Sequence, residues 1–387
     1  MKKRIEVFGS YALVALMTAV FTLSVMRIVL RRQTSKMDAV EQLIAAYFVG
    51  EVEREALEDA AVEAMVAATG DRWSYYIPAS DYETHLEQTE NAYVGVGITI
   101  QLDQELGGFP ILEVTAGGPA EEAGILAGDR LIRVGDQDVR EMTTEDVRNL
   151  VRGAEGSFVD LTVVREETEI TYSVERRRVE TPVATYEMLE GNVGLIAIEN
   201  FDARCAEETI GAIEALLEEG AEKLIFDVRF NPGGFADEMV EVLDYLLPEG
   251  KLFRTVRYDG KEEVDYSDEN CLDIPMAVLV NGDSYSAAEF FAAALQEYEA
   301  AVVVGEKTCG KGYFQNTFHL RDGSAVALSV GRYFTPKNVS LADVGVTPDV
   351  PVEVDEQTDS AIYYGTLPAM EDPQVQAALE ALELLGA

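Results

Sequence analysis

Two hydrophobic patterns divide the first half of the chain. Between residues 38 and 69, apolar side chains such as Val40, Leu43 and Phe48 recur every three to four positions. This spacing places them on one face of a helix, so it predicts amphipathic helices. From Val94 onward, apolar residues alternate with glycine and threonine. Alternation predicts half-buried strands, because successive side chains of a strand point to opposite faces.

The alternating pattern extends to about residue 176. The segments ILEV, RLIRV, FVDLTVV and EITYSV are typical of short strands. Between them, residues 144–152 place Val147, Leu150 and Val151 on one helical face. We therefore expect a small domain of strands and two short helices at residues 93–176, after an N-terminal helical region at residues 34–92.

The second half of the chain alternates buried strands with helices. The runs LIF (224–226) and AVLV (277–280) are apolar on both faces, and helical patterns at 206–219 and 236–247 precede and follow the first of them. Such strands belong to a sheet that helices cover on both sides. The fold class predicted is α/β, with a core at residues 177–350 that closes in hairpins. The tail, 351–387, predicts an amphipathic helix that either packs on the core or mediates a homodimer.

Composition and charge narrow the classes of function. The 387 residues are 48% hydrophobic, which is enough for several domains with their own cores. The net charge of −41 argues against a nucleic-acid partner, because no basic stripe is present to neutralise phosphates. Three widely spaced cysteines and two histidines predict neither a disulfide framework nor a metal site. We expect no cofactor.

The N-terminus contains 20 uncharged residues, 7–26, between basic flanks. About 20 apolar residues span a bilayer as a helix. A cleaved signal peptide is a competing interpretation, but no small-x-small cleavage site follows the apolar run. A buried core helix is the third. We predict an uncleaved membrane anchor within residues 1–33, with the rest of the chain as a soluble ectodomain.

The segment VGEKTCGKGYFQ, residues 304–315, nearly matches a phosphate-binding loop. Gly312 replaces the hydroxyl residue that would ligate magnesium, and an alternating strand follows instead of a helix. We therefore expect no nucleotide site. Lys311 would instead serve as a general base if burial destabilises its ammonium, and Gln315 would project to the same side of an extended backbone. A solvated surface lysine is the alternative interpretation.

Two serines, Ser284 and Ser286, follow a buried strand and open a helix. A serine at a helix start is commonly an N-cap that contributes about 1 kcal/mol. The same position suits a nucleophile, because free N–H groups at a helix start stabilise an oxyanion. The turn NPGG, residues 231–234, offers further N–H donors, although it is equally consistent with an ordinary turn.

Other pairs of nucleophile and base have weaker support. His319 lies in an alternating strand, and His85 lies among carboxylates in a segment that we expect to be helical and exposed. A Ser-His-Asp arrangement is therefore weakly supported. Cys309 could act as a thiol nucleophile, but no histidine is near it in the sequence.

Together these residues resemble the carboxyl-terminal processing proteases, the tail-specific serine peptidases that carry a PDZ domain. The resemblance covers nearly the whole chain. The segments YVGVGITI and GGPAEEAGILAGDRLIRVGD are similar to the family's PDZ domain. Three others are similar to its active-site segments: FDVRFNPGG, VLVNGDSYSAAEF and VGEKTCGKGYFQ. The resemblance also includes AMVAATGDRWSYYIP near the N-terminus and GVTPDV near the end. It implies a crotonase-like protease core with an inserted PDZ domain.

The resemblance also implies roles for individual residues. Ser286 would be the nucleophile, Lys311 the general base and Gln315 the group that orients the lysine. The N–H groups of Ala287 and Gly234 would form the oxyanion hole. Ser284 would then be the helix cap.

The PDZ-like part implies the substrate. Gly95, Val96, Gly97 and Ile98 would receive a terminal carboxylate, and the chain end would add as a strand opposite the 144–152 helix. The implied function is a membrane-anchored serine endopeptidase that acts outside the cytoplasmic membrane on proteins with exposed C-termini. The alternative is a catalytically inactive, PDZ-bearing adaptor that binds peptides.

Three positions depart from the family's pattern. Tyr285 stands between the two serines where the family has alanine, Phe230 replaces an asparagine, and Cys309 replaces a phenylalanine. None of them removes a catalytic group. Because Tyr285 and Cys309 differ from the family's residues, the family's pocket shape and substrate preference do not transfer in detail to this chain.

Overall fold

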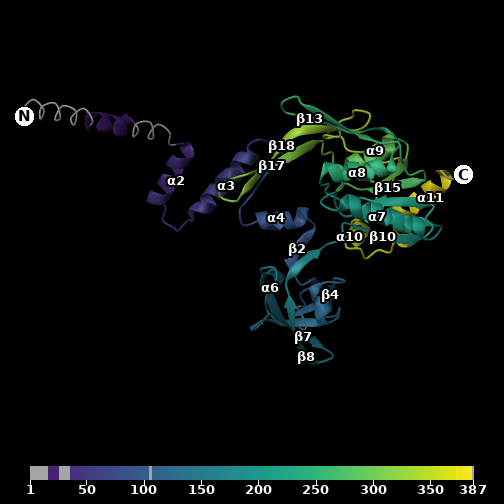
Figure 1. Cartoon of the computed structure of the whole chain (residues 1–387), viewed down its shortest axis with the longest axis horizontal. Coiled ribbons are helices and arrows are strands. Elements are labelled where there is room, and N and C mark those ends of the chain that lie inside the picture. Colours follow the sequence, from purple (N-terminus) through teal and green to yellow (C-terminus); the bar gives the residue numbers. More distant parts are fainter. Residues whose placement is uncertain (1–15, 26–34, 104–106, 386–387) are drawn as a thin grey trace, which may run out of the picture.

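The computed structural model describes residues 16–25, 35–103 and 107–385. Residues 16–25 are helical, and α2 (Lys36–Tyr47) and α3 (Arg54–Ala67) lie between them and the domains (Figure 1). Within the described ranges, no helix is long and apolar enough to cross a membrane. Much of the predicted anchor, residues 7–26, lies outside those ranges.

The large domain is built on a six-stranded sheet with the order β10-β11-β12-β15-β16-β19. All neighbouring pairs are parallel except the edge pair β10–β11, as expected for the α/β class. The strands are β10 (Ala184–Leu189), β11 (Val193–Ile198), β12 (Lys223–Asp227), β15 (Met276–Val280), β16 (Ala301–Gly305) and β19 (Val350–Pro351).

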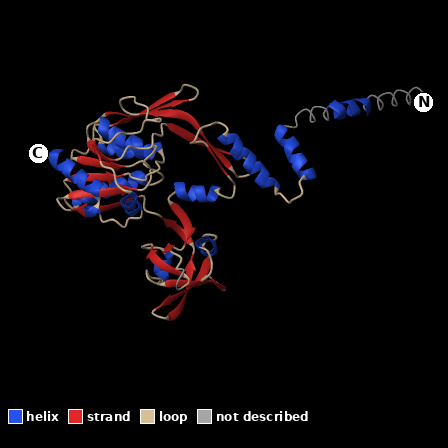
Figure 2. Cartoon of the chain, turned by 180° about the vertical axis from the view of Figure 1, so that it is seen from behind, coloured by secondary structure: helices blue, strands red, loops and turns tan. Residues whose placement is uncertain are grey.

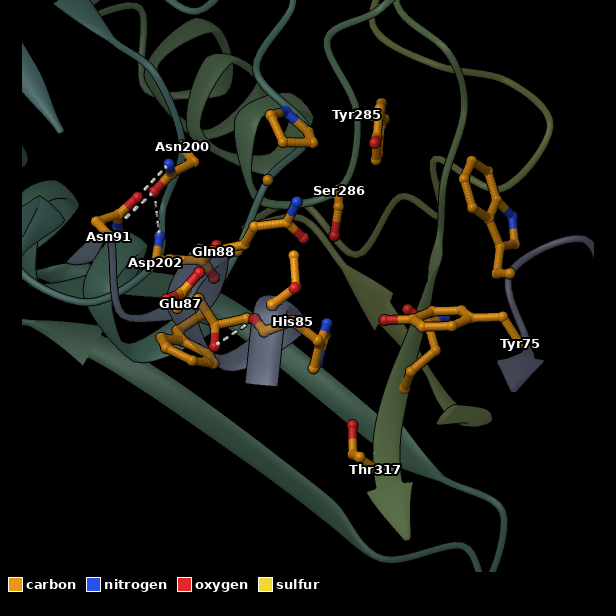
Figure 3. A pocket seen from close by; sticks show the side chains of 18 of the residues that line it. Tyr75, His85, Glu87, Gln88, Asn91, Asn200, Asp202, Tyr285, Ser286 and Thr317 are labelled. Atoms are coloured by element: carbon orange, nitrogen blue, oxygen red, sulfur yellow. Dashed lines mark hydrogen bonds between the residues drawn. The ribbon is translucent and has the colours of Figure 1, made fainter. Parts of the chain in front are cut away.

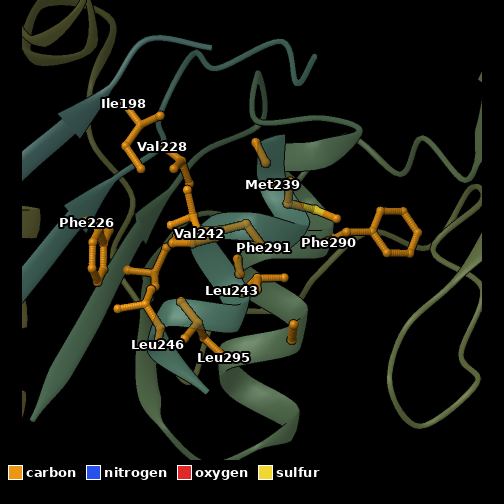
Figure 4. Close-up of a cluster of buried hydrophobic side chains, with 14 of the residues drawn as sticks. Ile198, Phe226, Val228, Met239, Val242, Leu243, Leu246, Phe290, Phe291 and Leu295 are labelled. Atoms are coloured by element: carbon orange, nitrogen blue, oxygen red, sulfur yellow. The ribbon is translucent and has the colours of Figure 1, made fainter. Parts of the chain in front are cut away.

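Alternate residues of these strands serve two separate cores. Phe226 belongs to the larger cluster, which contains side chains of α7 (Cys205–Glu218), α8 (Ala236–Leu246) and α9 (Ala287–Glu297) (Figure 4). Its neighbour Ile225 belongs to the cluster on the other face, against α11 (Pro373–Leu385). The C-terminal helix therefore packs on the core, one of the two arrangements that the sequence left open. Between β19 and α11 lie α10 (Glu356–Tyr363) and η1 (Ala369–Glu371).

A second sheet covers the helices of the large domain and extends toward α3 (Figures 1 and 2). Its strand β18 pairs with β17 in the hairpin expected after residue 312, and also with β1 from the N-terminal region. The strands are β1 (Tyr75–Ile77), β13 (Gly250–Arg257), β14 (Glu262–Ser267), β17 (Tyr313–His319) and β18 (Ala325–Phe334). The pairing of β1 with β18 brings the segment before β1 next to the hairpin that follows Lys311.

The small domain has its own hydrophobic core and is joined to the rest by a two-stranded ribbon. The ribbon consists of β2 (Ala92–Gly95) and β9 (Arg177–Glu180), and α4 (Tyr82–Thr89) precedes it. The domain's elements are β3 (Ile98–Ile100), β4 (Phe109–Val114), α5 (Pro119–Ala123), β5 (Arg130–Val134), β6 (Gln137–Asp138), α6 (Thr144–Val151), β7 (Phe158–Arg165) and β8 (Thr168–Glu175).

The alternating run from Val94 to Ile100 is interrupted rather than continuous. The chain leaves β2 after Gly95 and begins β3 at Ile98, and Gly97 between them has a φ of +75°. This left-handed conformation favours glycine. Alternation alone could not reveal the break, because glycine fits both an extended strand and a bend.

Candidate active site

Ser286, Lys311 and Gln315 line one cavity of about 940 Å³ between the large domain, α4 and α6 (Figure 3). The glycine turn that follows β12 lines the same cavity. These segments come from distant parts of the sequence. The parallel sheet brings them together, because the carboxyl ends of β12, β15 and β16 meet at one edge.

Ser286 occupies the N-cap position of α9, at the end of the loop that follows β15. Its backbone has φ +59° and ψ −124°, a conformation that costs a residue with a side chain about 1–3 kcal/mol. The side chain is almost entirely buried. Such strain persists only where the surroundings enforce it, and a buried carboxylate is the main restraint.

That carboxylate belongs to Glu289, which is fully buried. It accepts hydrogen bonds from the N–H of Ser286 (3.1 Å), from the N–H groups of Gly310 (2.7 Å) and Lys311 (2.8 Å), and from the Thr308 hydroxyl. Burial raises the pKa of Glu289, and these hydrogen bonds counteract part of that effect. Glu289 therefore fastens the serine turn to the lysine loop.

Sequence reasoning missed Glu289, although a signal was present. A serine at a helix start followed three residues later by glutamate is the capping-box pattern. Ser286 and Glu289 have this spacing. The pattern would have placed Ser286 rather than Ser284 at the N-cap.

Lys311 lies in an aromatic and mostly buried environment. Its ammonium nitrogen is 4.9 Å from the ring centre of Trp73 and 5.7 Å from that of Tyr285. Burial lowers the pKa of Lys311, and the nearby Asp71, Glu289 and Cys309 oppose the shift. The alternative of a solvated surface lysine does not describe this environment.

The hydrogen bonds that Gln315 makes in the described part of the chain go to residues other than Lys311. The Nε2 of Gln315 donates to the Ser329 hydroxyl (3.0 Å) and to the Tyr313 carbonyl (3.3 Å). The pairing of β17 with β18 is irregular between Phe314 and Gln315, so simple alternation does not hold there. Within the described part of the chain, no hydrogen bond joins the Lys311 amine to Gln315 or Ser286.

Tyr333 faces the nucleophile candidate from β18. Burial raises the pKa of Tyr333 to about 12, and the nearby Ser286 hydroxyl offsets part of the rise. Tyr333 and Ser286 line the same cavity. The sequence offered no sign of this arrangement, because a tyrosine in an alternating strand is usually a sheet residue.

The glycine turn lies directly against Ser286. Gly233 has φ +88° and Gly234 has φ +152°. A Cβ at Gly233 would be 2.6 Å from Ser286 Cβ, and one at Gly234 would be 2.2 Å from the carbonyl carbon of Phe201. The glycines are required by space as well as by backbone conformation.

The turn is held by Asn231, which is fully buried. Its Oδ1 accepts from the Gly233 N–H (2.8 Å), and its Nδ2 donates to the Ile198 carbonyl (2.7 Å). In the described part of the chain, no backbone carbonyl accepts from the N–H of Gly234 or Ala287. Both donors are therefore available to an oxyanion beside Ser286.

Ser284 is not the cap of α9, contrary to expectation. Its hydroxyl donates to the Val228 carbonyl (2.7 Å) and accepts from the Asn281 N–H (3.0 Å). It is fully buried. These bonds tie the end of β15 to the end of β12, so Ser284 supports the loop and does not face the cavity.

The two histidines take no part in a hydrogen bond with Ser286 among the described residues. His85 lies on α4 and lines the cavity, partly buried rather than exposed, and this burial lowers its pKa. His319 lies in β17, as expected for a sheet residue, with its ring centre 5.3 Å from that of Tyr82.

A second cavity of about 240 Å³ lies between the small domain's β3 and α6. Gly95, Val96, Gly97 and Ile98 all line it, opposite the helix, as expected. The two cavities have three lining residues in common: Tyr93, Arg148 and Arg152. The groove of the small domain and the cavity around Ser286 therefore adjoin.

Comparison with known proteins gives a consistent result. The model of Peptidase family S41 matches residues 192–352, and a PDZ domain model matches residues 111–165. A carboxyl-terminal-processing protease from Synechocystis sp. (strain ATCC 27184 / PCC 6803 / Kazusa) is 32% identical over 329 residues, which cover 83% of this chain and 76% of that protein. The carboxy-terminal processing protease CtpA of Bacillus subtilis (strain 168) is 31% identical over 319 residues, covering 82% and 68%.

Among solved structures, a putative S41 protease from Bacteroides fragilis NCTC 9343 aligns with 88% of this chain and 92% of its own, with a TM-score of 0.55 and 18% identity. This similarity supports the fold. The chain belongs to the carboxyl-terminal-processing proteases of peptidase family S41, which are serine-type peptidases, and it carries a PDZ domain.

Proposed function

We propose that this protein is a membrane-anchored serine endopeptidase that uses a Ser286–Lys311 dyad, with Gln315 in support, on proteins recognised through their C-termini. One observation carries the proposal. Glu289 holds the backbones of Ser286 and Lys311 together, at a cavity whose other wall is the glycine turn.

The chemistry follows from these positions. The amine of Lys311 accepts the proton of the Ser286 hydroxyl while Oγ bonds to the peptide carbonyl carbon. The carbonyl oxygen becomes an oxyanion that the N–H groups of Gly234 and Ala287 stabilise. The lysine then gives its proton to the leaving amine, and the peptide C–N bond breaks. Water, activated by the same amine, hydrolyses the acyl-enzyme.

Lys311 must be neutral to accept this proton. Burial favours the neutral form because it disfavours the charged one, whereas the two aromatic faces and Asp71 favour the ammonium. Tyr333 lines the same cavity as Ser286 and Lys311. The proposed proton transfer requires the Ser286 hydroxyl to point toward the Lys311 amine.

The PDZ domain would supply the substrate's chain end. A terminal segment that pairs with β3 beside α6 would enter the large cavity past the shared residues Tyr93, Arg148 and Arg152. The two arginines give the passage positive charge. Polypeptides with exposed C-termini are therefore the proposed substrates.

The proposed location is outside the cytoplasmic membrane, with an anchor within residues 1–33. What supports it is the run of 20 uncharged residues between basic flanks. Cell fractionation checks this proposal. The full chain should sediment with membranes and be digested by protease added outside the cytoplasm, and a chain without residues 1–33 should do neither.

The dyad is tested with the full chain in detergent and an unfolded protein substrate, following fragments by mass. Ser286→Ala and Lys311→Ala should lose at least about 10³-fold in rate. Ser284→Ala, the matched control, should keep cleavage if it folds, which circular dichroism verifies. Cleavage that survives Lys311→Ala would contradict the dyad. Peptide binding without cleavage by the unmodified chain would instead support an inactive adaptor.

A further inference from the structure

The turn at residues 71–74, immediately before β1, lies on the catalytic side of the large domain. Two of its side chains reach the loop that carries Lys311: Arg72 is 3.8 Å from the Cys309 sulfur, and Trp73 covers the Lys311 ammonium. Ser74, which is hydrogen-bonded to Asp71, reaches β18, the strand that pairs with the one carrying Gln315.

Asp71 is the organising group of this turn. Its carboxylate accepts hydrogen bonds from the Trp73 N–H (3.2 Å) and from the Ser74 hydroxyl (2.5 Å). The Ser74 hydroxyl in turn accepts from the Ser329 N–H (3.0 Å). Burial acts to raise the pKa of Asp71, but the polar groups of Ser329, Ser74 and the Trp73 N–H outweigh this effect and lower it.

Ser329 is also the partner of Gln315. Gln315 Nε2 donates to the Ser329 hydroxyl at 3.0 Å. Hydrogen bonds therefore connect Asp71 to Ser74, Ser74 to the Ser329 N–H, and the Ser329 hydroxyl to Gln315. Asp71 is also the carboxylate that acts most strongly on Lys311 through its charge.

We propose that Asp71 is a positioning residue for the dyad: its carboxylate anchors Gln315 through Ser74 and Ser329 and provides the countercharge that Lys311 needs while it holds the serine's proton. This inference rests on the proposed Ser286–Lys311 mechanism. It assigns a role in the reaction to a turn that lies more than 200 residues before the nucleophile.

The negative charge of Asp71 favours the ammonium form of Lys311. The groups that face Lys311 are Asp71, Glu289, Cys309 and the aromatic rings of Trp73 and Tyr285. Replacing Asp71 by Asn removes a negative charge, so the pKa of Lys311 falls further. The amine of Lys311 is then neutral at lower pH. The acid limb of the pH profile of kcat/KM, where activity rises as this amine loses its proton, therefore moves to lower pH.

The test measures kcat and KM against pH for the full chain with a fluorogenic peptide. For Asp71→Asn we expect the acid limb to move down by about 0.5–1 pH unit. On the plateau, kcat should fall about tenfold with KM nearly unchanged, because Gln315 is released and the protonated amine is less stabilised. Asp71→Glu should restore the position of the limb.

Asp59→Asn is the matched control. Asp59 accepts a hydrogen bond from the Tyr76 hydroxyl (2.6 Å), so the variant loosens the same part of the chain without removing a charge that acts on Lys311. The acid limb of the pH profile of Asp59→Asn should stay at its wild-type position. If Asp71→Asn behaves like Asp59→Asn, Asp71 is merely structural and the proposal is overturned.

Ser329→Ala keeps the proposal testable if Asp71→Asn does not fold. It breaks the link to Gln315 and leaves the charge, so kcat should fall while the limb remains in place. A wild-type kcat for this variant would overturn the link. Lys311→Ala in the same assay distinguishes failure of the dyad from failure of the Asp71 proposal. Activity in Lys311→Ala would refute the dyad itself. An inactive Lys311→Ala together with wild-type kinetics for Asp71→Asn would refute only the role of Asp71.

Discussion

At the scale of single residues, the site depends on charged groups that are kept away from water. Glu289 is buried with four hydrogen-bond donors around its carboxylate, and Lys311 is buried with aromatic rings around its ammonium. Burying a charged side chain without partners lowers the stability of the fold. Side chains with strongly shifted pKa values are concentrated at functional sites. Asp202 is a third such group, and its burial makes stability depend on pH.

Asp202 lines the large cavity and gives a pH-dependent prediction. Burial, with a smaller effect of Glu238, raises the pKa of Asp202 to about 7. The unfolded chain releases this proton near pH 4, so the side chain costs stability increasingly as pH rises from about 4 to about 7, and the cost is constant above that range.

Asp202→Asn should therefore raise the free energy of unfolding by about 1–4 kcal/mol near pH 8 and by much less near pH 4. Denaturant titration at both pH values measures the difference. A gain that is equal at the two pH values would show that the charge of Asp202 is not its origin.

At the scale of elements, the C-terminal helix is joined to the active-site side of the sheet by a buried ion pair. Arg229, at the end of β12, pairs with Asp227 and with Asp372 (2.7 Å), and both Arg229 and Asp372 are about 95% buried. Asp372 also accepts from the Gln374 N–H (2.8 Å) at the start of α11. One carboxylate thus caps the helix and anchors it.

Asp372→Ala should lower the free energy of unfolding by about 2–4 kcal/mol, because it removes a cap and leaves Arg229 with Asp227 as its remaining carboxylate partner. Asp372→Asn keeps the capping oxygen and removes the charge, so its loss should be smaller. Chemical denaturation compares the two variants. Equal losses would mean that only the ion pair matters.

The elements also show how far sequence patterns reach. The α/β core, the β17–β18 hairpin and the grouping of Ser286, Lys311 and the glycine turn follow from apolar runs and from segment resemblance. The placement of Asp71, Trp73 and Tyr333 does not, because it depends on β1 and β18 pairing across roughly 250 residues. Likewise, the bulge at Gln315 leaves no trace in an alternating pattern.

At the scale of the whole molecule, two domains with separate hydrophobic cores are connected through a narrow ribbon. The PDZ domain's core and the two cores of the large domain have no residue in common. Contacts between the two parts include the Arg152–Glu87 ion pair (2.7 Å) and the bonds from Arg204 to carbonyls next to the ribbon strands. Partly exposed ion pairs contribute roughly 0–1 kcal/mol, which is too little to make the parts unfold together.

Calorimetry should therefore resolve two unfolding transitions. Val163→Ala, in the PDZ core, should shift only one of them, and Leu243→Ala, in the large core, only the other, each by roughly 1–4 kcal/mol. A single transition that both variants shift together would show that the domains are thermodynamically coupled.

The placement of Trp73 has a spectroscopic consequence. It is the only tryptophan of the chain, and its indole lies over the Lys311 ammonium and 5.8 Å from the Tyr285 ring. Excitation at the red edge of the absorption band therefore selects one fluorophore, in van der Waals range of the reacting groups. Emission intensity and lifetime can follow deprotonation of the amine, acylation and product release in real time, without any attached label.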